Sequence, residues 1–261
     1  MSMLPRIIGH RGAKESAPEN TLASLREAVR QGVRWIEIDV MLTRDRVPVL
    51  IHDDRLDRTT DGTGAVADLD LADLRRLDAG SWFDPRFAGE TVPTLDECLD
   101  FVIGEGLGLN MEIKPYPGHE VATAEAAIAL LRRRWPTDLP PPLLSSFETV
   151  CLEVAQLQAP DWPRGYLMWE PPSDWATIAD RLGATTLNVE QSRQTAESVA
   201  AYRATGRPVL VYTVNDPTRA RELFGWGVTS IFTDAPGRVA AALSTSRTEY
   251  DGFFSPLANP L

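Results

Sequence analysis

Short apolar runs alternate along the chain with longer segments in which apolar residues recur every three or four positions. The short runs predict buried β-strands, and the longer segments predict amphipathic helices that cover a parallel sheet. We expect eight strands, at residues 6–9, 35–40, 109–113, 143–145, 165–168, 185–188, 209–212 and 229–232. Eight strand–helix units in about 250 residues are typical of a TIM (β/α)8 barrel, and a doubly wound α/β sheet is the structural alternative.

One apolar run does not fit this alternation. Val47–His52 begins only seven residues after Val40, whereas a parallel crossover needs about a dozen residues or more. We therefore interpret it as the return arm of a hairpin, followed by a small insertion at about 53–92 that is rich in Asp, Thr and Gly. The chain is expected to form a single catalytic barrel over residues 1–249, insertion included, with an extended C-terminal tail at 250–261.

Composition and charge narrow the class of protein. Of the 261 residues, 43% are hydrophobic and 24% charged, and the formal net charge of −11 opposes binding to nucleic acid or to an anionic membrane. No apolar run is long enough to span a membrane and no secretory signal is visible, so we expect a cytoplasmic protein without stable membrane insertion. Cys98 and Cys151 fall in apolar helical patterns, which predicts buried core thiols. The sequence does not indicate an oligomeric state.

Two acidic residues share one face of the strand at 35–40. The two-residue period places Glu37 and Asp39 on that face and apolar side chains on the other. The apolar face is expected to pack against helices, which turns both carboxylates into the mouth of the barrel. Burying carboxylates costs free energy unless a cation or a basic side chain is near. We therefore expect a cation or a basic side chain beside Glu37 and Asp39.

The strand at 109–113 adds a third carboxylate. Glu112 shares its face with Asn110 and Lys114, so it also points inward. Three oxygen donors without a nearby cysteine suit a hard cation, Mg²⁺ or Ca²⁺, better than zinc. The alternative is that the acids form ion pairs with Lys114, Arg11 or other basic neighbours. Their joint position at the carboxyl ends of strands, where barrel active sites are built, favours the metal site.

Two of the three histidines close strands. His10 ends the first strand and His52 ends the return arm of the hairpin. Beside a carboxylate cluster, such a pair can act as general acid and general base near neutral pH. Arg11 and Lys114 would supply the positive charge that a phosphodiester and its transition state require. His119 lies in a loop without acidic company, so we expect it to be exposed to solvent.

These residues belong to motifs that follow one another over nearly the whole chain. The motifs are His10-Arg11-Gly12, Pro18-Glu19-Asn20-Thr21, Glu37-x-Asp39, His52-Asp53, Glu112-x-Lys114, Tyr212-Thr213-Val214-Asn215 and Thr233-Asp234-Ala235-Pro236. In this order they resemble the glycerophosphodiester phosphodiesterase family. The resemblance implies a barrel enzyme that uses Mg²⁺ or Ca²⁺ to hydrolyse deacylated phospholipids. Glycerophosphocholine or glycerophosphoethanolamine would yield sn-glycerol 3-phosphate and an alcohol.

The resemblance also implies roles for single residues. By position, Glu37, Asp39 and Glu112 are implied metal ligands, His10 and His52 the acid/base pair, and Arg11, Lys114, Asn20 and Tyr212 substrate contacts. Asn20 has an equal alternative as the N-cap of the helix that follows it. Two positions depart from the family pattern, which usually has Trp in place of Tyr212 and Asp-Gly in place of Asp45-Arg46. Tyr212 keeps an aromatic wall and adds a hydroxyl that could alter the substrate pocket.

The expected reaction begins when one histidine removes the proton of the glycerol hydroxyl next to the ester. Attack on phosphorus would expel the alcohol, which the second histidine protonates, and water would open the cyclic phosphate with the roles reversed. Which histidine is the base, and whether metal-bound water attacks directly, stay open. One rival is a lysophospholipase D-like enzyme with an apolar rim, for which Trp82, Phe83 and Phe87 are candidates. The other is a catalytically silent binding barrel.

Overall fold

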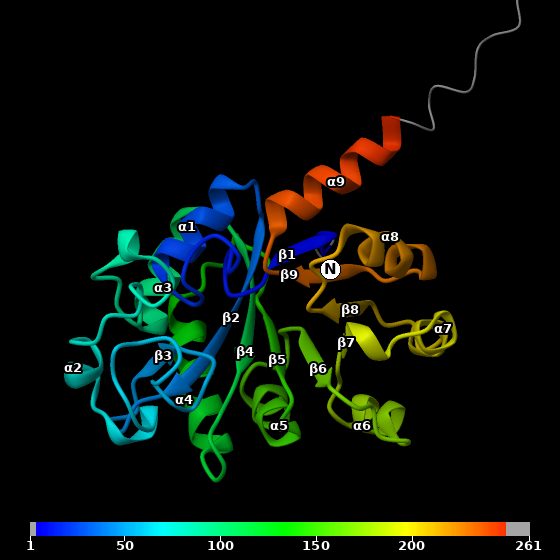
Figure 1. The fold of residues 1–261 in the computed structure, drawn as a ribbon. Helices are drawn as coiled ribbons and strands as arrows, with labels where there is room; N and C mark the ends of the chain where they lie inside the picture. The colour runs from blue at the N-terminus through cyan, green and yellow to red at the C-terminus, as the bar shows by residue number, and fades with distance from the viewer. Residues whose placement is uncertain (1–3, 249–261) are drawn as a thin grey trace, which may run out of the picture.

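The computed structural model describes residues 4–248 of the 261. Its sheet contains a closed barrel of eight parallel strands, in which the first strand lies beside the last (Figure 1). The barrel strands are β1 (Ile7–Gly9), β2 (Trp35–Leu42), β4 (Gly108–Ile113), β5 (Leu143–Ser146), β6 (Arg164–Met168), β7 (Thr186–Glu190), β8 (Val209–Tyr212) and β9 (Ser230–Thr233). Because β1 pairs with both β2 and β9, the ring is closed. The predicted TIM barrel is confirmed, and the doubly wound alternative is wrong.

The remaining strand forms the predicted hairpin. In it β3 (Pro48–Leu50) runs antiparallel to β2, with Val40 opposite Leu50. Arg46 makes the turn with a positive φ of 64°, and its amide donates to the carbonyl of Thr43 over 2.9 Å. The strand is shorter than the predicted arm, so His52 lies just beyond its end in a bend.

Helices surround the barrel and cover its outer face (Figure 1). They are α1 (Leu22–Arg30), α2 (Leu71–Leu74), α3 (Leu95–Gly104), α4 (Glu120–Arg134), α5 (Thr149–Gln158), α6 (Trp175–Arg181), α7 (Ala196–Arg203), α8 (Pro217–Trp226) and α9 (Pro236–Thr248), with 3₁₀ turns η1 (Val66–Asp68), η2 (Pro85–Phe87) and η3 (Gln191–Arg193). No helix in residues 4–248 is long and apolar enough to cross a bilayer. The predicted tail at 250–261 lies outside the described residues, so its extended form stays a prediction.

The apolar side chains divide between the two faces of the barrel. Ile36, Ile38 and Val40 of β2 point outward into the core between strands and helices, as the strand period predicts. Inside the barrel, a smaller cluster that includes Ile8 and Phe232 fills the centre. Buried polar side chains also lie inside the barrel, where Asn110 donates to Ser145 and Thr186 donates to Asn188. The interior is therefore packed, and the charged side chains lie at its mouth.

The insertion after β3 has a small core of its own. Leu56, Val66 and Leu74 are fully buried there against Val49 and Ile51. Its aromatic residues pack on one another, with ring centroids 5.7 Å apart for Trp82–Phe83 and 5.8 Å apart for Phe83–Phe87. The insertion is thus a folded cover attached to the hairpin arm and not an open loop.

Both cysteines are fully buried core residues, as predicted. Burial raises the pKa of the Cys98 thiol well above its ordinary value, and burial raises that of Cys151 to about 12. Neither thiol is therefore available as a nucleophile near neutral pH.

Candidate active site

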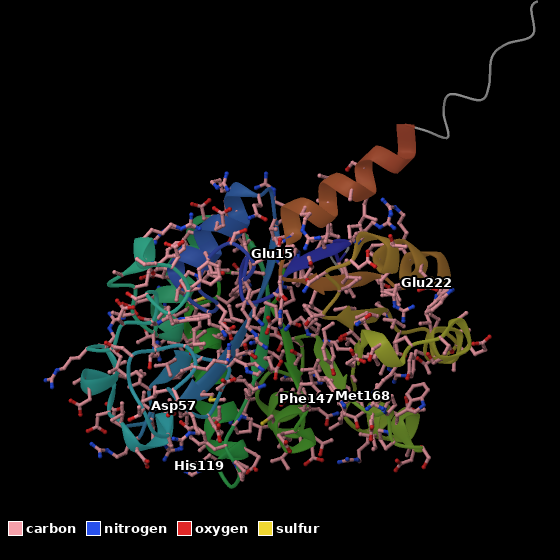
Figure 2. All side chains as sticks on the ribbon, viewed as in Figure 1. Glu15, Asp57, His119, Phe147, Met168 and Glu222 are labelled. Carbon is pink, nitrogen blue, oxygen red and sulfur yellow. The ribbon has the colours of Figure 1, made fainter. Side chains whose placement is uncertain are left out.

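A cavity of about 300 Å³ opens at the carboxyl ends of the barrel strands. Most of the predicted site residues meet there, drawn from strands that are far apart in the sequence. The cavity is lined by His10, Arg11, Glu37, His52, Asn110, Glu112, Lys114, Ser145, Phe147, Leu167, Trp169, Tyr212, Thr213 and Phe232. His119 does not join them: it is exposed, as predicted, and lies at the edge of the molecule in Figure 2.

The three predicted carboxylates form one cluster. Glu37 and Asp39 come from β2 and Glu112 from β4, and the pairing of Asp39 with Glu112 places the strands in register. One oxygen from each residue lies within 4.8 Å of the others. Within residues 4–248 no other group of three potential ligands meets this criterion. The inward orientation read from the strand period is therefore confirmed.

The cluster carries more negative charge than its surroundings balance. Burial and the neighbouring carboxylates raise the pKa of Glu37 well above its ordinary value. Burial and the charge of Asp39 raise the pKa of Glu112 to about 7. Burial also raises the pKa of Asp39, but the charge of Arg11 and other cations outweighs it, and the net shift is downward. A cation bound among the three would remove this cost.

The donor atoms of the cluster fit a divalent cation. Glu37 Oε1 and Asp39 Oδ1 are buried and have no hydrogen-bond partner, although buried polar atoms are nearly always paired. Glu112 Oε1 also lacks a hydrogen bond and forms an ion pair with Lys114 Nζ at 3.5 Å. An all-oxygen donor set of this kind is the one that Mg²⁺ and Ca²⁺ prefer.

His10 is held by a carboxylate from the last strand. Its Nδ1 lies 2.6 Å from Oδ1 of Asp234, whose other oxygen accepts from Asn215 Nδ2 over 2.8 Å. The pKa of Asp234 is lowered: burial raises it, but the hydrogen bond from His10 and the other polar contacts outweigh burial. Asp234 is therefore an anionic acceptor, which fixes the proton on Nδ1 and leaves Nε2 free. That Nε2 lies 4.0 Å from Glu37 Oε2.

His52 has the same arrangement with a neighbouring residue. Its Nδ1 lies 2.6 Å from Asp53 Oδ1, and Lys114 Nζ lies 2.8 Å from its Nε2. Because an ammonium group can only donate, Nε2 accepts and the ring proton is on Nδ1. Burial lowers the pKa of both His10 and His52 below the ordinary value, so both rings are neutral at pH 7 and present an unprotonated Nε2.

Arg11 is tied to carboxylates at the edge of the cavity. Its backbone has a positive φ of 51°, which lets its amide donate to Glu37 Oε2 over 3.0 Å. Its Nη1 donates to Glu19 Oε1 over 2.7 Å, and its Nε lies 3.0 Å from Asp39 Oδ2. The ion pairs considered as an alternative to the metal site thus exist beside the carboxylate cluster, yet leave two of its oxygens unpartnered.

Asn20 does not cap the helix that follows it, so that alternative is wrong. The N-cap of α1 is Thr21, whose hydroxyl accepts from the amide of Ser24. Asn20 has a positive φ of 56° instead, which turns its side chain back toward β2. There its Nδ2 donates to Asp39 Oδ2 over 2.8 Å, and its Oδ1 accepts from the Asp39 amide over 3.2 Å. Asn20 therefore orients a carboxylate of the cluster.

The far wall of the cavity is aromatic. Of its three aromatic residues, the sequence predicted only Tyr212. Phe147 and Trp169 follow the ends of β5 and β6, and they are 37% and 56% exposed. Phe147 meets Tyr212 edge to face, with centroids 5.9 Å apart. The Tyr212 hydroxyl donates to the carbonyl of Met168 over 2.9 Å, so the structure gives it a backbone partner. Trp82, Phe83 and Phe87 do not line this cavity.

This geometry defines a class of protein. Two neutral imidazoles, each fixed by a carboxylate, face a cavity beside the carboxylate cluster. The guanidinium of Arg11 and the ammonium of Lys114 line the same cavity. Such a site suits acid/base hydrolysis of an anionic ester.

Comparisons with known proteins identify the family. Residues 10–238 match the glycerophosphoryl diester phosphodiesterase family. A glycerophosphodiester phosphodiesterase of Bacillus subtilis is 34% identical, covering 88% of this chain and 83% of its own. One of Caldanaerobacter subterraneus is 34% identical, covering 88% and 94%. The structure of a phosphodiesterase from Oleispira antarctica, in complex with the product sn-glycerol-3-phosphate, is similar with a TM-score of 0.90 and 42% identity, covering 92% and 97%.

The chain therefore belongs to the glycerophosphoryl diester phosphodiesterase family and is a phosphodiester-hydrolysing enzyme. The resemblance read from the motifs is confirmed.

Proposed function

We propose that the enzyme hydrolyses glycerophosphodiesters such as glycerophosphocholine and glycerophosphoethanolamine to sn-glycerol 3-phosphate and an alcohol. The observation that carries this proposal is the pair of imidazoles, His10 and His52, which line one cavity beside three carboxylates. The Nε2 of His10 is free, and the Nε2 of His52 accepts from Lys114. The product named in the Oleispira antarctica structure supports the same substrate class.

A divalent cation, Mg²⁺ or Ca²⁺, completes the proposed site. Glu37, Asp39 and Glu112 would hold it, because their oxygens converge and two of them lack any other partner. When bound, it neutralises phosphate charge and lowers the pKa of a coordinated hydroxyl. Asn20 keeps one of these carboxylates, Asp39, in place through two hydrogen bonds.

The histidines move the protons in the proposed reaction. The Nε2 of one histidine takes the proton from the glycerol hydroxyl next to the ester, and the hydroxyl oxygen bonds to phosphorus. The bond from phosphorus to the alcohol oxygen breaks, and the second histidine gives a proton from Nε2 to the departing alcohol. Because both rings are neutral in the free enzyme, this histidine takes up that proton from solvent when the anionic substrate binds. Water then opens the cyclic phosphate with the histidine roles exchanged, which restores both rings.

Lys114 and Arg11 are the proposed cationic contacts of the phosphate. Lys114 Nζ lies between His52 Nε2, at 2.8 Å, and Glu112 Oε1, at 3.5 Å, so it faces the point where substrate and cluster meet. Arg11 is already paired with Glu19, which holds its guanidinium at the cavity edge. Both would stabilise the charge that develops on the phosphoryl oxygens.

The size and walls of the cavity favour a small alcohol group over an acylated one. A volume of about 300 Å³ matches the lower end of ligand pockets, which span about 300–1,000 Å³. The proposed acyl-chain rim on the insertion does not line the cavity. The aromatic wall formed by Phe147, Trp169 and Tyr212 would then contact the glycerol or the alcohol moiety.

A product-release assay tests the proposal. Glycerophosphocholine, glycerophosphoethanolamine and lysophosphatidylcholine would be compared with Mg²⁺, with Ca²⁺ and with EDTA. We expect metal-dependent release of sn-glycerol 3-phosphate from the first two substrates. Faster turnover of lysophosphatidylcholine would favour the lysophospholipase D-like alternative. No turnover of any diester in saturating metal would favour the silent barrel.

A further inference from the structure

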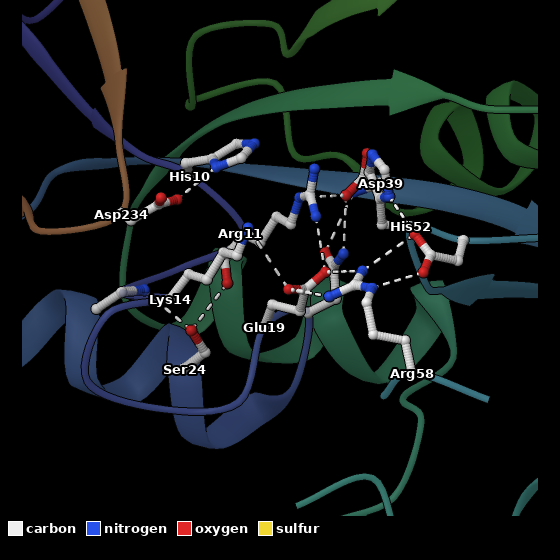
Figure 3. Close-up of polar contacts among 12 residues, drawn as sticks. His10, Arg11, Lys14, Glu19, Ser24, Asp39, His52, Arg58 and Asp234 are labelled. Atoms are coloured by element: carbon white, nitrogen blue, oxygen red, sulfur yellow. Dashed lines mark hydrogen bonds and ion pairs between the residues drawn. The ribbon is translucent and has the colours of Figure 1, made fainter. Parts of the chain in front are cut away.

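Arg58 lies in the insertion, outside the catalytic cavity, and makes four hydrogen bonds to two carboxylates. It donates to Asp53 from Nε over 2.6 Å and from Nη2 over 3.0 Å. It donates to Glu19 from Nη1 over 2.9 Å and from Nη2 over 2.8 Å. Figure 3 shows its guanidinium between Glu19 and the carboxylate beside His52.

Both carboxylates also hold a residue that lines the cavity. Glu19 Oε1 accepts from Arg11 Nη1 over 2.7 Å, and Asp53 Oδ1 accepts from His52 Nδ1 over 2.6 Å. These are the same two oxygens that receive Arg58 Nη2. Arg58 Nη2 therefore connects Glu19, which holds Arg11, to Asp53, which holds His52.

We propose that Arg58 is a positioning residue that sets the spacing between Arg11 and His52. This inference rests on the proposed function of those two residues. Arg58 does not line the cavity and so does not contact the substrate. It acts through Glu19 and Asp53, and it makes the insertion part of the catalytic apparatus.

The chemistry of the site requires an arginine. Glu19 has a side chain that is only 2% exposed and depends on Arg11, Arg58 and the more distant Lys14 for its charge balance. Only a planar guanidinium with five donors can bond two carboxylates at once with fixed geometry, whereas a lysine offers a point charge. Loss of Arg58 would remove two of the hydrogen bonds that orient Asp53, leaving the one to His52, and would leave Glu19 short of a partner.

A purely structural role would have a different signature. If Arg58 only attached the insertion to the barrel, its replacement would lower stability and leave turnover unchanged. Arg75 provides the matched control, because it also joins the insertion to the barrel through a two-bond ion pair, with Glu97 of α3. Its side chain is 38% exposed, close to the 43% of Arg58, and it does not line the cavity.

The test compares Arg58→Gln, Arg58→Lys and Arg75→Gln with the unaltered enzyme in hydrolysis of glycerophosphocholine. We expect kcat to fall by about 10²-fold in both Arg58 variants, because small misplacements of catalytic groups have costs of that order. KM should rise as well, because Arg11 is displaced. Arg75→Gln should keep both constants within about twofold while losing comparable thermal stability.

Two further results decide the inference. In the Asp53→Ala background, Arg58→Gln should lower kcat by far less than in the unaltered enzyme, because the link to His52 is already broken. Additive losses, or a folded Arg58→Lys variant with unchanged kcat and KM, would overturn the positioning role and leave the proposed function intact. An unaltered enzyme that turns over no glycerophosphodiester would overturn both.

Discussion

Replacing Asp234 with asparagine should disable His10 without disturbing the fold. The surrounding hydrogen bonds dictate how the new amide must lie. Asn215 Oδ1 accepts from the Asp234 amide over 2.9 Å and from the Thr233 hydroxyl over 3.0 Å, so its Nδ2 must face the residue at 234. That Nδ2 donates over 2.8 Å to Asp234 Oδ2, and an asparagine would have to present its oxygen there.

The amide nitrogen of Asp234→Asn would then face His10 Nδ1, at the position where Oδ1 now lies 2.6 Å away. Because this nitrogen can only donate, Nδ1 would have to accept, and the ring proton would move to Nε2. Nε2 could then no longer take a proton, because the resulting imidazolium would point its Nδ1–H at the amide nitrogen of residue 234, which is also a donor. A histidine lost from acid/base work costs about 10²–10⁴-fold in rate, so we expect kcat to fall within that range.

The measurement is steady-state hydrolysis of glycerophosphocholine in saturating metal by the unaltered enzyme and by Asp234→Asn, with thermal unfolding of both. Substrate binding does not involve the replaced oxygen, so KM should change by less than about threefold. A variant that is folded and keeps kcat within about threefold of the unaltered enzyme would refute the reasoning about the His10 tautomer.

Other residues of the site and of the core allow further predictions. Glu112→Gln should shift activation by Mg²⁺ or Ca²⁺ to higher concentration in a metal titration; an unchanged curve would remove Glu112 from the cation site. Cys98, fully buried with a raised thiol pKa, should react with a thiol reagent at pH 8 only as the protein unfolds in urea, and prompt labelling would contradict its burial. The hydrogen bonds from Arg58 hold the pKa of Asp53 at about 2, below its ordinary 3.8. The stability that Asp53 contributes should therefore be present above about pH 4 and be lost as pH falls through about 2. Urea unfolding from pH 2 to 6 should show the unaltered protein and Asp53→Asn converging at the acidic end, and a constant difference would contradict it.

The strand period predicted the carboxylate cluster because a two-residue repeat fixes which side chains share a face. Glu37, Asp39 and Glu112 needed only that rule and the position of strand ends in a barrel. The N-cap of α1 was harder to predict, because Asn and Thr are both good N-cap residues. The positive φ of Asn20, which excludes it from that role and leaves Thr21 as the cap, cannot be read from the sequence.

The supports of the histidines could not be predicted in the same way. Asp234 lies 224 residues from His10, and nothing in the local pattern pairs the two. Arg58 carries no periodic signal at all, since it lies in an irregular segment of the insertion. Phe147 was within reach of the pattern: the expected fourth strand, at 143–145, ends one residue before the observed β5, and Phe147 directly follows the observed end.

The account depends most on His52 as a proton carrier at Nε2 beside the carboxylate cluster. The direct measurement is kcat of His52→Ala for release of sn-glycerol 3-phosphate from glycerophosphocholine in saturating metal. We predict a loss of about 10²–10⁴-fold with the unfolding temperature nearly unchanged, since the ring is partly exposed and lies in a bend. Near-normal turnover by the folded variant would contradict the two-histidine mechanism.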